Sequence, residues 1–155
     1  MQGTFQTRDM LAVLYGLRIG VRRLMEEGRE RTWSRHEAIA AGSQAGLEGL
    51  GLRLVAKPQH RSATVTAAWL PENMEWGPFN ADMRSRGLVV AGGQGKWAGK
   101  IMRFGHMGMV EIDEMVDAVR VMGETMADHG FGTDVTAACQ ATRDAYEASR
   151  SAAAR

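Results

Sequence analysis

One arginine stands in a stretch of the sequence that otherwise has the composition of a strand followed by a turn. Arg103 lies within GKIMRFGHMG, residues 99–108. The pattern KIMRF predicts a strand, in which Arg103 points to the face opposite Met102 and Phe104. A planar guanidinium matches the two oxygens of a carboxylate, and the glycines that follow permit close backbone approach. Arg103 is therefore either a carboxylate-binding residue or a solvated charge on a strand.

The residues before this strand, GGQGKWAG at 92–99, contain the glycine spacing of a dinucleotide-binding loop. Such a loop places its phosphate on the N-terminus of a following helix. A strand is predicted next instead, so this segment is interpreted as a tight turn. The four histidines have no metal-ligand spacing, and no metal site is predicted; these are His36, His60, His106 and His129.

The elements that would position Arg103 follow from hydrophobic periodicity and capping signals. Five helices are predicted. One begins at the capping box SRHE (Ser34–Glu37) and ends at Gly51, another begins at Ile112 and ends at Gly130, and the others span 9–27, 78–86 and 134–149. Strands are predicted at 52–55, 62–70, 88–91 and 100–104, with the apolar run LVVA at 88–91 as a buried central strand. This order predicts an α+β fold, a small mixed or antiparallel sheet with helices mainly on one face, preceded by a long helix.

The composition is that of one ordinary globular domain. The chain has 155 residues, of which 45% are hydrophobic and 24% charged. A net charge of +1 argues against a nucleic-acid partner or an acidic membrane surface. Cys139 is the only cysteine, and we find no signal peptide or membrane span, so a cytoplasmic protein is expected.

Three segments together resemble the C-terminal part of class V pyridoxal-phosphate aminotransferases, in particular the alanine–glyoxylate and serine–pyruvate group. They are SATVTAAWLPENM, GGQGKWAGKIMRFGHMG and EIDEMVDAVRVMGETM. The resemblance begins near the first helix and runs to about Gly130, so residues 1–130 are interpreted as the small domain with its leading helix. The helix and tail at 131–155 are left unassigned.

The resemblance implies roles for individual residues. Arg103 matches the arginine that binds the substrate's α-carboxylate, and Gly93 and Gln94 match the loop beside it. Thr7 corresponds to a residue that reaches the cofactor phosphate of the partner subunit, although Arg8 stands where the family usually has proline. The family's Schiff-base lysine lies upstream of every segment matched here. None of Lys57, Lys96 and Lys100, the only lysines, replaces it.

The resemblance thus implies a C-terminal part of a pyridoxal-phosphate-dependent aminotransferase that moves an amino group from alanine or serine to glyoxylate or pyruvate. The isolated chain is expected to be inactive, and to bind no cofactor alone, because the lysine domain is not within it. Two alternatives stay open: a non-catalytic carboxylate-binding or interaction module derived from that domain, or one chain of a split two-chain enzyme. The expected partners are the large cofactor-binding domain or a chain that supplies it, and a second copy through self-association or a homodimer.

Overall fold

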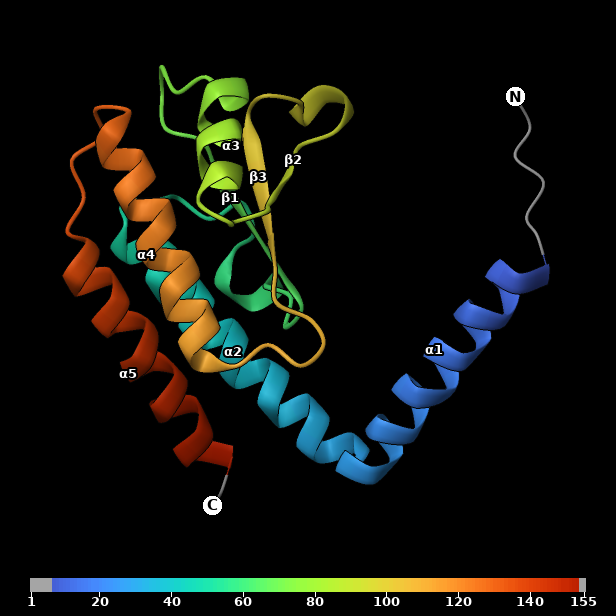
Figure 1. Cartoon of the computed structure of the whole chain (residues 1–155). Helices are drawn as coiled ribbons and strands as arrows, with labels where there is room; N and C mark the ends of the chain where they lie inside the picture. The colour runs from blue at the N-terminus through green and yellow to red at the C-terminus, as the bar shows by residue number, and fades with distance from the viewer. Residues whose placement is uncertain (1–6, 154–155) are drawn as a thin grey trace. The chain divides into compact units, whose positions relative to one another are not determined.

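The computed structural model describes residues 7–153, and side chains from Met10 onward. The helices are α1 (Thr7–Glu27), α2 (Arg29–Gly49), α3 (Trp76–Ser85), α4 (Ile112–Asp128) and α5 (Val135–Ala153). The strands are β1 (Val65–Trp69), β2 (Ala91–Gly92) and β3 (Ile101–Gly105), and short 3₁₀ turns lie at Pro58–His60 and Gly95–Trp97. Figure 1 shows these elements in chain order. The α+β prediction is confirmed.

Residues 7–153 divide into two compact units between Ser34 and Arg35. The first unit holds α1 and the beginning of α2. The second holds the sheet, the remaining helices and the hydrophobic core, in which Phe79, Met83, Val119 and Met122 are fully buried. Arg103 belongs to the second unit, so the site is built from that unit alone.

The three-stranded sheet is antiparallel, with the strand order β1-β3-β2. Thr66 pairs with Phe104 and Ala68 with Met102, which places these four residues on the same, buried face. That face packs against the core supplied by the helices. The central strand is β3, the strand that carries Arg103.

The prediction of a central strand at 88–91 is wrong. Only Ala91 and Gly92 pair, as the edge strand β2. Val90 is buried at 4% exposure, whereas Val89 is 65% exposed. A short apolar run occurs both in strands buried on two faces and in segments buried on one face only. Here only one face of the segment packs against the core.

Two boundaries near α2 also differ from prediction. The Ser34–Glu37 capping box does not begin a helix, because α2 already begins at Arg29, directly after Gly28 with φ of 84°. The predicted strand at 52–55 is reduced to a single bridge between Leu54 and Ala68. Its backbone still bonds to β1 on both sides of that bridge, through Trp69 N–H to Arg53 O at 2.9 Å and Val55 N–H to Ala67 O at 2.8 Å.

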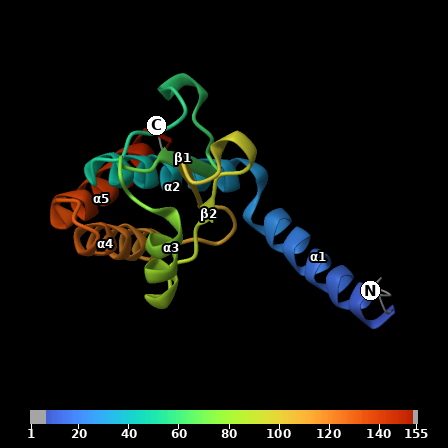
Figure 2. The ribbon, with the colours of Figure 1, turned by 90° about the horizontal axis from the view of Figure 1, so that it is seen from above.

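Three glycines of α2 allow α4 and α5 to approach closely. A Cβ on Gly46 would lie 2.2 Å from Thr142 Oγ1 and 2.8 Å from Val119 Cγ2. A Cβ on Gly42 or Gly49 would lie 2.8 Å or 3.0 Å from the backbone of α5. Helices α4 and α5 run side by side in both views (Figures 1 and 2). The segment left unassigned by the sequence therefore contributes buried residues to the same unit as the sheet; the division at residue 130 stays a prediction.

Candidate functional site

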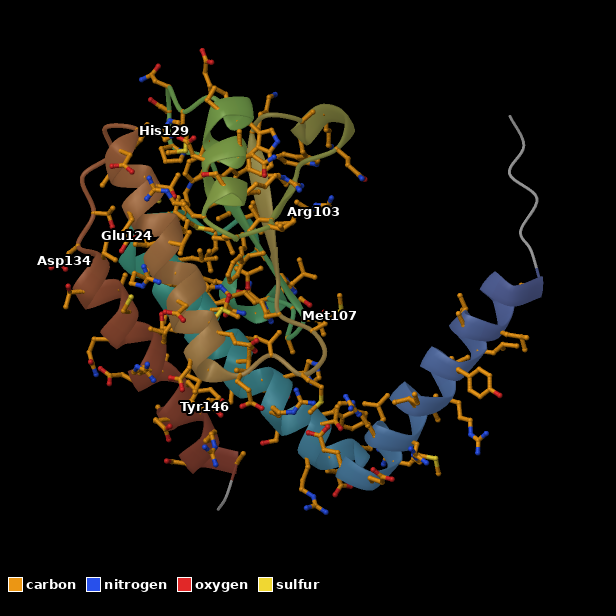
Figure 3. The ribbon with its side chains drawn as sticks, viewed as in Figure 1. Arg103, Met107, Glu124, His129, Asp134 and Tyr146 are labelled. Carbon is orange, nitrogen blue, oxygen red and sulfur yellow. The ribbon has the colours of Figure 1, made fainter. Side chains whose placement is uncertain are left out.

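Arg103 projects from the centre of the sheet on the face away from the core. Its strand neighbours Met102 and Phe104 are buried, at 1% and 4% exposure, whereas Arg103 is half-buried. This confirms the predicted alternation. Figure 3 shows Arg103 on the side of the sheet away from α4.

The residues paired with Arg103 are small. Its partner on β1 is Ala67 and its partner on β2 is Ala91. Directly opposite residues are the closest side-chain neighbours in an antiparallel sheet. The guanidinium is therefore flanked across the sheet by two methyl groups, the smallest side chains other than that of glycine.

One hydrogen bond sets the direction of the guanidinium. Arg103 Nε–H donates to the carbonyl oxygen of Gly92 at 3.0 Å. No other hydrogen bond or ion pair of this side chain occurs within the described residues. The N–H donors of Nη1 and Nη2 therefore remain available, and together they can bind both oxygens of a carboxylate end-on.

The loop that follows Gly92 is compact. Gly93 N–H donates to Ile101 O at 2.9 Å, and a Cβ on Gly93 would lie 2.1 Å from Trp97 O, so only glycine fits. Gln94 is exposed and precedes the 3₁₀ turn, where its carbonyl accepts Trp97 N–H at 3.0 Å. The turn leads directly into β3 without an α-helix, as the sequence predicted. Substrate contacts of Gly93 and Gln94 stay predictions, and Gly92 is the loop residue that bonds to Arg103.

Two tryptophans that are distant in sequence meet beside this loop. The rings of Trp69 and Trp97 lie 5.1 Å apart between centroids, at an interplanar angle of 65°. The Arg53 guanidinium lies 4.8 Å from the Trp69 ring centroid, and Lys96 Nζ lies 5.3 Å from that of Trp97. Such edge-to-face and cation–π contacts stabilise the loop on the outer face of β1. No local sequence pattern indicates this cluster, because it depends on the register of β1 with β3.

The GHMG turn after β3 is hydrogen-bonded to α2. Gly108 has φ of 83°, and both of its backbone groups bond to α2. Its N–H donates to His36 Nε2 at 3.3 Å and its carbonyl accepts from Arg35 Nη1 at 2.5 Å. Gly108 therefore holds the turn against α2, and the predicted role of these glycines beside the Arg103 guanidinium stays a prediction.

His106 is buried in the same turn. It is 1% exposed, and its Nε2 lies 2.9 Å from Thr66 Oγ1 on β1. Burial lowers the pKa of His106 from 6.5 to about 4, with a backbone hydrogen bond at Ala63 opposing the shift and the nearby His36 adding to it. The neutral imidazole is therefore a structural group at physiological pH.

The remaining candidate residues do not form a second centre of chemistry. His129 Nε2 lies 2.8 Å from Asp82 Oδ2 and its ring packs on Phe79, which joins α4 to α3. Burial raises the pKa of the Cys139 thiol, which disfavours the reactive thiolate. Within residues 7–153, no group of three or more histidine, cysteine, aspartate or glutamate side chains could hold a metal ion. No helix in this range has the length and apolar character needed to cross a bilayer.

The lysines of the second unit do not fit a pyridoxal-phosphate site. Lys57, Lys96 and Lys100 are all exposed, and the Nζ of Lys96 lies against the Trp97 ring. A lysine that binds this cofactor covalently needs a lowered pKa in a desolvated pocket. The side chain of Thr7, the predicted phosphate contact, lies outside the described residues. Carboxylate binding by Arg103 stays a prediction, which its two Nη groups are chemically able to fulfil.

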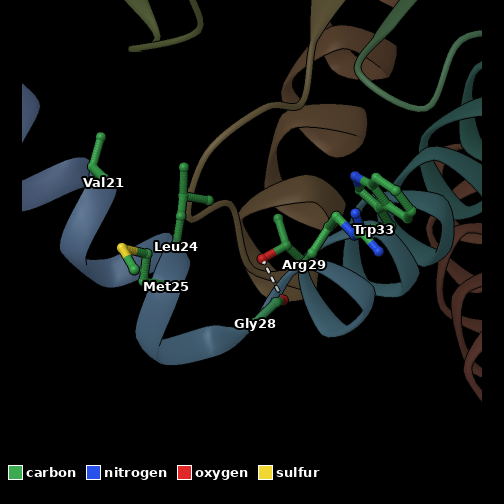
Figure 4. Close-up of a pocket in the computed structure, with 7 residues that line it drawn as sticks. Val21, Leu24, Met25, Gly28, Arg29 and Trp33 are labelled. Carbon is green, nitrogen blue, oxygen red and sulfur yellow. Dashed lines mark hydrogen bonds between the residues drawn. The ribbon is translucent and has the colours of Figure 1, made fainter.

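The first unit contains an open hollow of about 440 Å³ at the bend between α1 and α2. Figure 4 shows Leu24 and Met25 of α1 and Trp33 of α2 around it. Thr32 Oγ1 donates to Gly28 O at 3.0 Å and holds the start of α2 at this bend. The lining is mostly apolar and carries no acid–base pair.

Comparison with known proteins agrees with this picture. No family model matches the chain. An uncharacterized aminotransferase of Methanocaldococcus jannaschii is 39% identical over 118 residues, which are 76% of this chain and 31% of the relative. The (S)-ureidoglycine–glyoxylate transaminase of Bacillus subtilis is 34% identical over 142 residues, 90% of this chain and 34% of that enzyme. The crystal structure of the ureidoglycine–glyoxylate aminotransferase from Bacillus subtilis superposes with a TM-score of 0.82 at 31% identity, over 86% of this chain and 35% of that one.

The sequence and the fold therefore place the chain among the class V aminotransferases, which depend on pyridoxal phosphate. Its relatives within that class include alanine–glyoxylate and serine–glyoxylate aminotransferases. The chain spans about a third of the length of the relatives it matches.

Proposed function

We propose that this chain is the C-terminal, substrate-carboxylate-binding part of an aminotransferase that acts on small amino acids such as alanine or serine and small 2-oxo acids such as glyoxylate or pyruvate. The observation that carries the proposal is the Arg103 guanidinium, whose Nη donors extend from the sheet while Gly92 holds its Nε–H at 3.0 Å. The aminotransferase homologues support the reaction class.

In this proposal Arg103 binds the α-carboxylate and thereby orients the amino-bearing carbon. A bidentate fork restrains both the position and the rotation of the carboxylate, which a single ammonium group does not. The flanking Ala67 and Ala91 keep the approach open for a short substrate. Pyridoxal phosphate supplies the electron sink of transamination when bound, and its lysine must come from residues outside this chain.

The proposal extends to assembly and location. The complete protein acts in the cytoplasm as a homodimer, with residues 1–130 as the small domain and its leading helix. The 155-residue chain alone has no transaminase activity. An absorbance scan of the purified chain with pyridoxal phosphate, followed by borohydride reduction, tests this. A stoichiometric reducible adduct on Lys57, Lys96 or Lys100 would show that the chain builds its own cofactor site.

A chimera tests the reaction. This chain replaces the matching third of the Bacillus subtilis ureidoglycine–glyoxylate transaminase, and glyoxylate-dependent transamination is measured. We expect activity that is lost in Arg103→Lys and kept in Arg84→Lys, a matched change at an exposed arginine of α3. A folded chimera that holds the cofactor but shows no activity would favour the non-catalytic module. Activity restored by mixing separate chains would favour the split enzyme.

A further inference from the structure

The orientation of Arg103 depends on a carbonyl group that lies on a very short strand. Gly92 is the last residue of β2, which pairs over only two residues with β3. Its carbonyl accepts the Nε–H of Arg103. If β2 shifted along or away from β3, this acceptor would move and the guanidinium would rotate about its side-chain torsions.

The indole ring of Trp76 covers Gly92 at the place where other residues carry a side chain. A Cβ on Gly92 would lie 2.9 Å from both Cε2 and Nε1 of Trp76, and 3.0 Å from its Cζ2. These distances are shorter than van der Waals contact, so the ring and the backbone of β2 can touch only because residue 92 is glycine.

Trp76 itself is held in place by the core. It is the first residue of α3, it is half-buried and it packs against the main hydrophobic cluster. One turn further along α3, Phe79 is fully buried. Since core side chains pack at crystal-like density, the ring offers a firm support to the edge strand.

We propose that Trp76 is a positioning residue for the carboxylate-binding fork of Arg103, acting through its contact with Gly92. This inference rests on the function proposed above. According to this inference, Trp76 does not touch the substrate. The Trp76 ring restrains the position of β2, and the Gly92 carbonyl then restrains the Nε–H of Arg103 through its hydrogen bond. The two Nη groups are thereby held in one orientation in which they can bind a carboxylate.

The test uses the full 155-residue chain in solution NMR, without ligand and then with pyruvate as the probe. The ligand-free measurement is the hydrogen exchange of Arg103 Nε–H. We expect exchange to be faster by about fivefold or more in Trp76→Leu and in Gly92→Ala, the change produced by losing one modest hydrogen bond. Trp76→Phe, which keeps an aromatic face, should recover part of the protection.

If Trp76 had only a structural role, its replacement would speed hydrogen exchange throughout the second unit and not specifically at Arg103 Nε–H. The backbone amide of Val119, fully buried on α4, therefore serves as the internal reference, and Trp33→Leu, at a tryptophan 57% exposed in the first unit, as the matched control. Unchanged Arg103 Nε–H exchange in Trp76→Leu and Gly92→Ala would overturn the proposal. Should Trp76→Leu unfold, Trp76→Phe and Gly92→Ala decide it by the same readout.

The pyruvate titration separates this inference from the proposed function. Wild-type protein should show pyruvate-dependent shifts of the Arg103 Nη resonances, and Trp76→Leu should bind pyruvate more weakly by about fivefold. Absence of any shift in the wild type contradicts the carboxylate-binding function, whereas the ligand-free exchange still decides the role of Trp76. Equal pyruvate affinity in wild type and Trp76→Leu contradicts the inference alone.

Discussion

Arg103 Nε–H donates to the carbonyl oxygen of Gly92 at 3.0 Å, across the pair of strands β3 and β2. This bond decides which part of the guanidinium faces outward. Because Nε is engaged, a carboxylate must be met by the two Nη groups. The site is therefore defined by the backbone of an edge strand as much as by the arginine.

Replacement of Arg103 by lysine should weaken pyruvate binding although the positive charge is kept. An ammonium group cannot donate in parallel to two oxygens, and it loses the bond to Gly92. We expect a loss of roughly 1.5–3 kcal/mol in binding free energy, the range for a hydrogen bond to a charged group. Titration of both proteins by NMR measures it. Equal affinities would show that charge alone accounts for binding.

Gly93→Ala should destabilise the fold and loosen the loop beside Arg103. The new Cβ would lie 2.1 Å from Trp97 O and 2.9 Å from Ile101 Cγ1. Overpacking of this kind costs about 1–3 kcal/mol. Urea unfolding provides the measurement, and Gly77→Ala is the control because a Cβ there meets no atom within 4 Å. If both variants are equally stable, the turn is more tolerant than its geometry indicates.

Stability should fall as the pH is lowered from neutral, and His106 should account for part of the fall. Its pKa is lowered from 6.5 to about 4 by burial, so the unfolded chain binds a proton more readily than the folded one over this interval. The sign of linkage is then clear: unfolding becomes easier as pH drops through 6.5, and the effect is complete near pH 4. A shift of this size corresponds to at most about 3 kcal/mol.

The check is urea unfolding of the wild type and His106→Gln as a function of pH. The variant should be less stable at neutral pH, because it disturbs the buried contact with Thr66, but its stability should depend less on pH. His60→Gln is the matched control, since His60 is exposed. Parallel pH profiles for wild type and His106→Gln would mean that other groups cause the acid sensitivity.

The isolated chain should self-associate through α1. Several of its large apolar side chains are exposed, among them Leu14 at 56%, Leu17 at 61% and Met25 at 78%. A contiguous apolar surface of this kind favours association in water. Sedimentation velocity should show concentration-dependent association that Leu17→Glu reduces, while Arg18→Gln, with the same change in net charge, does not. A monodisperse wild-type monomer would contradict this expectation.

The sequence by itself determined the elements whose signal is local. The alternation around Arg103 placed its side chain opposite Met102 and Phe104, and the periodic apolar residues of 112–126 predicted α4. The resemblance of three segments to class V aminotransferases identified the class. These inferences succeeded because periodicity, and the sequence motif around Arg103, are properties of contiguous residues.

Only the tertiary structure decided how those elements meet. The apolar run at 88–91 became an edge segment because just one of its sides faces the core, and Ser34–Glu37 fell inside a helix that restarts directly after Gly28. The contacts of Trp69 with Trp97, and of Gly92 with both Trp76 and Arg103, join residues through strand register and helix packing. Such contacts depend on the free energy of the whole packed unit, and no local pattern encodes them.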